Sequence, residues 1–164
     1  MEAMGQFGDH ARLQQFALGA LSNLAFGDDV DAHVRREDII NEGGIALVLA
    51  SMQRLESDEW VQKEGCAAIM HIAASEGAFD AVVEDAIKAI ARAMGGFRGS
   101  VVLQKCAAYA LTMLVFDIPP RVALALEAGV GPLLAHAADI GSHAAVSQLQ
   151  RMGVPYVVGW EQQP

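Results

Sequence analysis

The sequence predicts an all-α fold, a right-handed α-α superhelix of about three three-helix units followed by a degenerate fourth. The first supporting observation is a helical segment that occurs three times, at residues 13–25, 61–74 and 103–115. The copies are offset by 48 and 42 residues when aligned on their shared glutamines, Gln14, Gln62 and Gln104. A period near this length without strand alternation is typical of α-solenoids, which mainly hold other proteins.

A second repeated element accompanies the long segment. A shorter helical segment at residues 44–52 recurs at 86–94 and again at 129–137. Pro132 falls in the first turn of the third version, where its missing backbone N–H has no helical partner to lose. Each unit is therefore expected to contain a glycine-marked helix, a short turn and then the long helix.

The composition supports the same class. Apolar residues make up 53% of the 164 residues, charged residues 19% and aromatic residues 6%. This apolar content is ample for a packed core and argues against disorder over most of the chain. The scarcity of aromatic residues suits closely packed helices better than a β-sandwich.

The long segments carry two different faces. In the middle copy an apolar stripe follows the helical period and consists of Val61, Gly65, Ala68, Ile69 and Ile72. The opposite stripe consists of Lys63, Ala67 and His71, and its counterparts are Gln15, Gly19 and Asn23 in the first copy and Lys105, Tyr109 and Met113 in the third. We expect the apolar stripe to pack between units and the variable stripe to meet ligands or water.

Turn signals divide the chain into an N-terminal extension (1–9), a repeat domain (10–152) and an apolar C-terminal tail (153–164). Asp9 is expected to cap a helix that begins near His10. The tail has no helical period, so it either covers the last unit or contacts a partner.

Capping signals place the remaining elements. Beyond the long segments, helices are expected at residues 34–41, 44–55, 79–85, 86–94, 121–128, 130–138 and 143–152, with a stop at Gly95-Gly96. The stretch 57–59 starts the middle long helix, and Ser100 starts the third. Ser142 is expected to cap a fourth, degenerate long helix, in which Gln148 lies 44 residues after Gln104.

Charge and cysteine content restrict the partners. The net charge of −9 and the absence of any basic run beyond Arg35-Arg36 argue against nucleic-acid and anionic-membrane binding. No apolar run approaches the roughly 18–20 residues of a membrane span, and the N-terminus has no signal-peptide pattern. Cys66 and Cys106 match no zinc motif and are expected to be buried thiols, which favours the cytoplasm or another reducing compartment.

Units of about 42 residues, with a glycine-led second helix and a third helix that begins Val-Gln-Lys, resemble the armadillo repeat. HEAT repeats are the nearest similar family. The resemblance covers residues 10–152 and is carried by the phrases at residues 21–25, 41–45, 61–65 and 127–130. It implies a groove lined by the third helices, in which an asparagine near the end of each third helix holds an extended peptide.

The chain departs from the family pattern in that groove. The asparagine place holds Asn23 once and otherwise His71 and Met113. The place of the tryptophan found in importin-like members holds Gly19, Ala67 and Tyr109. The departures argue against a role in nuclear import.

The variable stripe supplies the candidate partner-binding residues, which are Gln15, Asn23, Lys63, His71, Lys105, Tyr109 and Met113. Lys63 and Lys105 occupy equivalent points of adjacent helices, and they either receive an acidic protein segment or are solvated. Tyr109 either contacts a ligand, as amphipathic rings often do, or packs on the adjoining helix. For His71 a solvated or internally bonded ring is favoured over a ligand contact.

Chemistry-bearing motifs are missing from the sequence. Asp28, Asp29, Asp31 and His33 form the one cluster that resembles a metal site, and it lacks the glycine and further ligands of a calcium loop. No phosphate loop or nucleophile motif is present, so neither an enzyme nor a cofactor is expected.

Two classes of function remain. In the first, the protein is a non-enzymatic scaffold that binds a protein or peptide segment in the groove. In the second, it is a structural subunit of a larger multiprotein assembly, held through the solenoid ends and the apolar tail around Tyr156 and Trp160. About three units is near the minimum for a stable solenoid, which lends weight to the second class.

Overall fold

The computed structural model describes residues 2–74, 82–115 and 118–156, and all regular secondary structure in these ranges is α-helical. The predicted all-α class is confirmed. The helices are α1 (Glu2–Gln6), α2 (Ala11–Ala25), α3 (Val30–Asn41), α4 (Gly44–Arg54), α5 (Glu59–Ile72), α6 (Val83–Gly96), α7 (Val101–Val115), α8 (Pro119–Glu127), α9 (Val130–Asp139) and α10 (His143–Arg151).

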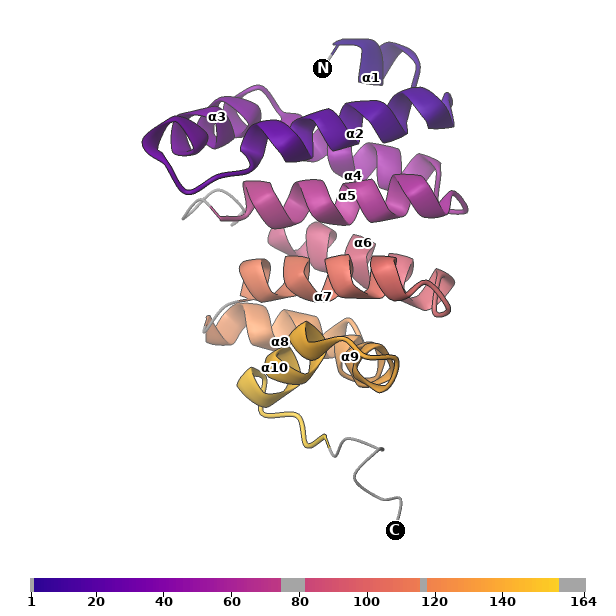
Figure 1. Cartoon of the computed structure of the whole chain (residues 1–164), viewed down its shortest axis with the longest axis vertical. Helices are drawn as coiled ribbons and strands as arrows, with labels where there is room; N and C mark the ends of the chain where they lie inside the picture. Colours follow the sequence, from indigo (N-terminus) through magenta and orange to yellow (C-terminus); the bar gives the residue numbers. More distant parts are fainter. Residues whose placement is uncertain (1, 75–81, 116–117, 157–164) are drawn as a thin grey trace.

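The three long helices stack as neighbours (Figure 1). Helix α5 packs between α2 and α7, and α10 follows on the far side of α7. Helices α4, α6 and α9 form a second row behind them, in which α6 contacts both α4 and α9. The arrangement places one face of α2, α5, α7 and α10 on the same side of the molecule.

The predicted apolar stripe of α5 is buried throughout. Ile69 is only 1% exposed. Gly65 is required by close packing, because a Cβ there would lie 2.5 Å from Cγ of Met52 on α4. The expectation that this face packs between neighbouring helices is confirmed.

The glutamine shared by the long helices has a structural role that the alignment did not reveal. Nε2 of Gln104 donates to the carbonyl oxygens of Met94 (2.8 Å) and Phe97 (3.0 Å), at the end of α6. Gln14 and Gln62 also donate to carbonyls ten and seven residues earlier. The glutamine side chain, called the glutamine clamp below, satisfies carbonyls that a helix end leaves without partners.

The caps of the long helices show a regular register. The capping side chains are His10, Asp58, Ser100 and Ser142, which accept from backbone N–H groups three residues later. Their offsets are 48, 42 and 42 residues. In this register Val146 takes the glutamine place of α10, so the alignment of Gln148 with Gln104 is wrong.

Two other predicted starts are corrected, and a third is assigned to one residue. His10 caps α2, whereas Asp9 forms an ion pair with Arg54 (Nε to Oδ1, 3.6 Å). Asp58, the second residue of the expected start at 57–59, caps α5. Asp29 caps α3, which begins at Val30 and not near residue 34.

Further boundaries also differ. Helix α6 begins at Val83 and continues through Gly95-Gly96, which were expected to end it. Helix α8 begins at its prolines because the first turn needs no N–H donors from them. Of the predicted helix at 79–85, residues 79–81 lie outside the described residues, and the last three residues belong to α6.

The expected N-terminal extension contains the short helix α1. Helix α1 contacts α2 and α4, and its Met4 is buried in the core. Among the described residues, no single helix has the length and apolar character to cross a membrane. Helices α8 and α9 meet that requirement only when taken together, and they are bent by 83° at the break between them.

Candidate protein-binding face

The candidate site is the outward stripe of α5 and α7, called the ladder face below. Its members are Trp60, Lys63, Val102, Lys105, Tyr109 and Met113. Lys105, Tyr109 and Met113 are exposed as predicted, and Asn23 is exposed at the corresponding place on α2. Gln15, Lys63 and His71 are half-buried.

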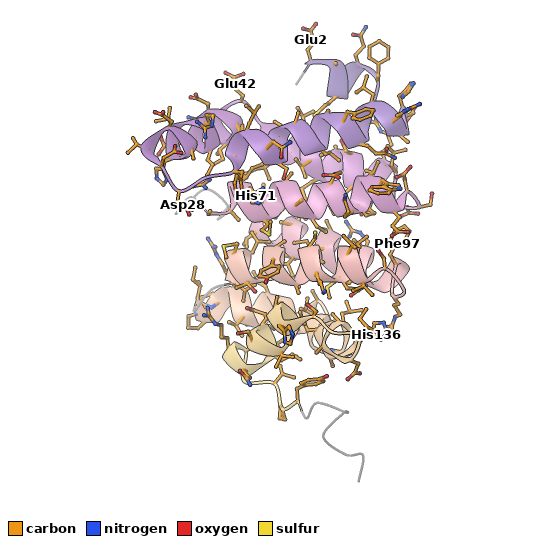
Figure 2. The ribbon with its side chains drawn as sticks, viewed as in Figure 1. Glu2, Asp28, Glu42, His71, Phe97 and His136 are labelled. Atoms are coloured by element: carbon orange, nitrogen blue, oxygen red, sulfur yellow. The ribbon has the colours of Figure 1, made fainter. Side chains whose placement is uncertain are left out.

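Two of the predicted site residues join α2 to α5. Gln15 Nε2 donates to Oδ1 of Asp58 at 3.1 Å. His71 Nδ1 lies 2.9 Å from Oγ and 3.0 Å from the carbonyl oxygen of Ser22. The His71 ring also meets Phe26 edge-on, at 5.2 Å between ring centroids, near the C-terminal end of α5 (Figure 2). Both side chains are engaged within the protein.

The two lysines of the stripe are not equivalent. Lys63 Nζ forms an ion pair with Glu64 Oε1 at 2.7 Å and lies 4.4 Å from the centroid of the Trp60 ring. Lys105 is exposed and forms no ion pair within the part of the chain that the structure describes. Because an exposed, unpaired ammonium attracts an anion more readily, Lys105 is the stronger contact for an acidic group.

Large apolar side chains gather on the ladder face. Trp60 is 61% exposed, Val102 60% and Tyr109 49%. Trp60 and Val102 occupy equivalent positions, 42 residues apart and two before the clamp glutamine. Sequence reasoning missed both residues, although their place relative to the shared glutamine marks them. An exposed group of large apolar side chains is typical of a protein-interaction surface.

The ladder face continues onto α10. A cavity of about 220 Å³ separates Tyr109 and Thr112 of α7 from His143, Ser147 and Arg151 of α10. In the register set by the caps, Ser147 and Arg151 follow Lys105 and Tyr109 along the stripe. The misaligned Gln148 hid these two residues from sequence reasoning.

A second exposed surface lies on α2 and is called the end face below. It consists of Phe16, Ala20 and Leu24. Leu24 is 51% exposed, whereas its counterparts Ile72 and Leu114 are 0% exposed. In α5 and α7 these positions are buried by the preceding helix of the stack, so the end face presents core-type residues without a covering helix.

The described part of the tail packs on α9 and α10. The Tyr156 hydroxyl donates to Oδ1 of Asp139 at 2.7 Å. Partial burial, this hydrogen bond and the charge of Asp139 raise the pKa of Tyr156 to about 12. Val154 N donates to the carbonyl oxygen of Leu149 at 3.0 Å. Trp160, the other residue of the expected alternative interface, lies outside the described residues.

Metal-ligating side chains and thiols in the described part of the chain do not meet the requirements of a metal site or of an activated thiol. In the described ranges, no group of three or more His, Cys, Asp and Glu side chains is placed to hold a metal ion. Both cysteines are free thiols; Cys66 is buried as expected, whereas Cys106 is only half-buried. Burial raises the pKa of both thiols, so they stay protonated at neutral pH. Comparison of the chain with models of known families, with curated proteins and with solved structures gave no match.

Proposed function

We propose that the chain is a non-enzymatic binding module, an armadillo-like α-solenoid that binds a protein segment on the ladder face. The observation that carries this proposal is the exposure of Trp60, Val102, Tyr109 and Met113 on one side of consecutive stacked helices. These side chains are too large and too numerous in one place to be explained as isolated surface residues.

The solenoid part of the proposal is supported by the regularity of the units. The glutamine clamp occurs in three consecutive long helices with the same acceptor spacing. The caps keep a constant offset from α5 to α10. Helices α2, α5 and α7 pack mainly on their neighbours among the long helices, as expected for a repeat protein, and α10 packs on both α7 and α9.

The chemistry of the face indicates the kind of segment. Trp60, Val102 and Tyr109 offer contacts for aliphatic or aromatic side chains. Lys105 offers a cation to an acidic residue next to them. We therefore expect an extended or helical segment that combines apolar and acidic residues.

The first prediction concerns peptides selected from a displayed library on the immobilised full chain. Replacing Trp60 and Tyr109 together by Ala is expected to weaken binding of these peptides at least ~10-fold, since aromatic anchors often contribute more than ~1 kcal/mol each. Binding is also expected to weaken with added salt, because exposed charges are screened over ~8–10 Å at physiological ionic strength. Fluorescence anisotropy of labelled peptides measures both effects.

Two further variants make this test specific. Phe16→Ala removes an aromatic ring that is even more exposed, at 70%, from the end face and is expected to leave peptide affinity unchanged. The double variant Lys63→Glu, Lys105→Glu is expected to reduce binding of acidic peptides most, mainly through Lys105. Peptides that bind the Trp60, Tyr109 double variant as tightly as the wild type would exclude the ladder face as the interface.

The end face favours a second candidate function, that of a structural subunit in a larger assembly. Leu24 occupies the position that holds Ile72 in α5 and Leu114 in α7, and both of those side chains are completely buried. Burying a leucine side chain completely contributes about 1.5–3 kcal/mol, and because Leu24 is 51% exposed, a helix docked here would gain about half of that from this residue.

A prediction separates this second candidate from the first. The wild-type chain is expected to self-associate at high concentration through the end face, and Phe16→Glu with Leu24→Glu is expected to make it monomeric. Size-exclusion chromatography with light scattering measures the association, and thermal melts check that the fold persists. A wild type that remains monomeric at every concentration would argue against the subunit role.

A further inference from the structure

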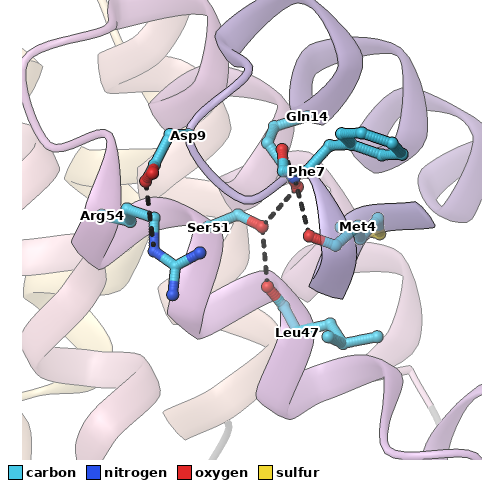
Figure 3. Close-up of polar contacts among 7 residues, drawn as sticks. All are labelled: Met4, Phe7, Asp9, Gln14, Leu47, Ser51 and Arg54. Atoms are coloured by element: carbon cyan, nitrogen blue, oxygen red, sulfur yellow. Dashed lines mark hydrogen bonds and ion pairs between the residues drawn. The ribbon is translucent and has the colours of Figure 1, made fainter. Parts of the chain in front are cut away.

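An arginine of the chain itself lies across the opening between α4 and the turn that joins α1 to α2, with its side chain 52% exposed (Figure 3). Arg54, the last residue of α4, pairs with Asp9 (Nε to Oδ1, 3.6 Å). A Cβ at Gly8 would overlap the Arg54 guanidinium, which shows how closely the group is packed there. Behind it, Ser51 Oγ lies 2.8 Å from Oε1 of Gln14 and is a donor to it. Only a cavity of about 140 Å³ remains.

The equivalent opening one unit later has no arginine side chain across it. The residue 42 positions after Arg54 is Gly96, which likewise ends its helix. The following residues, Leu55 and Phe97, have nearly the same backbone angles, φ −115° and ψ 46° against φ −122° and ψ 51°. The two places are therefore structurally equivalent, and one lacks the arginine.

Two neighbouring positions are also smaller at the second place. Ala89 is at the position equivalent to Leu47, and Ala93 is at the position equivalent to Ser51. The result is a cavity of about 480 Å³, called the α4–α6 cavity below. Its lining consists of Met52, Glu56, Ser57, Gln62, Ala89, Arg92, Ala93, Gly96 and Phe97. Figure 2 shows Phe97 at the edge of the stack, where α6 turns into α7.

Two side chains of the cavity lining, Gln62 and Glu56, offer oxygen atoms that could accept hydrogen bonds from a ligand. Gln62 is 3% exposed, and its Nε2 is used in the clamp. Its Oε1 accepts no hydrogen bond from the described residues, because Ala93 lacks the hydroxyl that Ser51 provides one unit earlier. Glu56 occupies the position equivalent to Gly8 and contributes a carboxylate to this cavity. The carboxylate forms no ion pair within the described ranges.

We propose that the α4–α6 cavity binds the side chain of an arginine from a partner protein, which would lie there as Arg54 lies across the equivalent opening one unit earlier. A guanidinium has several donors in a planar fork, which suits the carboxylate of Glu56 together with Oε1 of Gln62. Its aliphatic stem fits against Met52 and Phe97. The site is separate from the ladder face and does not depend on it.

Arg92 selects among arginines. It lines the cavity from α6, is exposed, and forms no ion pair with a described residue. Its charge opposes a bare guanidinium and favours one that has a carboxylate nearby. The fitting ligand is thus an arginine followed by an acidic residue or by a free carboxylate, and N-acetyl-L-arginine is the smallest probe of this class.

The test is an NMR titration of the full chain with N-acetyl-L-arginine. Amide shift changes are expected around Ser57, Gln62 and Gly96, with a Kd on the order of 1 mM for so small a ligand. N-acetyl-L-citrulline, which has the same shape without the charge, is expected to bind at least ~10-fold more weakly, since hydrogen bonds between charged partners are the stronger ones. Equal binding of the two probes, no binding, or shifts confined to other regions would overturn the proposal.

Three variants complete the test. Gly96→Arg gives the chain its own arginine at this place and is expected to raise Tm and reduce probe binding at least ~10-fold, because Arg is also the better helix former. Gly96→Ala is the matched control, since its Cβ meets no atom within 4 Å, and it is expected to raise Tm without affecting binding. Glu56→Gln is expected to lose binding with the fold retained. Undiminished binding by Gly96→Arg or by Glu56→Gln would contradict the assignment.

Discussion

Replacing Ile69 by Asp is expected to destabilise the protein severely and to lower its Tm steeply. The side chain is 1% exposed on α5, the helix that packs between α2 and α7. An unpaired carboxylate there is expected to cost more than ~4 kcal/mol, out of the roughly 5–15 kcal/mol that stabilises a domain of this size. Far-ultraviolet circular dichroism during thermal unfolding measures the loss.

His71→Ala is the control for this prediction, because it alters the same helix two residues later on the opposite face. It removes the hydrogen bond to Ser22 and the ring contact with Phe26. The expected cost is about 1–2 kcal/mol, so the variant should remain folded with a lowered Tm. If His71→Ala proves the more damaging change, the assignment of the buried and outward faces of α5 is wrong.

Gln104→Leu is expected to destabilise the protein by about 2–3 kcal/mol. The change leaves the carbonyl oxygens of Met94 and Phe97 without the two donors that the glutamine clamp supplies. Leucine keeps the volume and the helix propensity, so the loss reports on hydrogen bonding and not on packing. Chemical denaturation gives the free energy of unfolding.

Gln148→Leu is the matched control for the clamp. Gln104 and Gln148 are both buried, and the Oε1 atom of each lacks a hydrogen-bond partner among the described residues. Gln148 lies two residues beyond the clamp position of α10, so its replacement is expected to be neutral or stabilising. Equal destabilisation by the two variants would show that the clamp does not contribute to stability.

The helices and their buried faces were predictable from the sequence. Helical periodicity places apolar residues on one side regardless of what covers them, so the stripe that includes Val61, Ile69 and Ile72 was predicted correctly. Ser100 and Ser142 were also identified as caps, because a capping oxygen and its N–H partner are only three residues apart. Such local relations are present in the sequence itself.

Some boundaries depended on distant residues. Asp9 has the chemistry of a cap, but it pairs with Arg54 from α4, and His10 caps α2 instead. The alignment of Gln148 with Gln104 failed because matching residue types cannot replace the register that the Ser142 cap sets. In both cases the deciding contact or geometry exists only in the folded chain.

The candidate site was only partly predictable. The exposure of Lys105, Tyr109 and Met113 was predicted correctly from their positions, because they lie opposite the buried stripe. It could not show that Gln15 and His71 are bonded to residues 43 and 49 positions away, or that Lys63 is held by Glu64 and Trp60. The availability of a polar side chain depends on neighbours that the fold supplies.

The sequence by itself determined the helical class, the repeating units and the side of each long helix that faces the core, since these follow from local periodicity. Only the tertiary structure decided which outward residues are free and where space remains between units. The α4–α6 cavity shows the reason, because its lining comes from α4, α5, α6 and the turns between them. The missing arginine becomes visible only when Gly96 is placed beside Glu56 and Gln62.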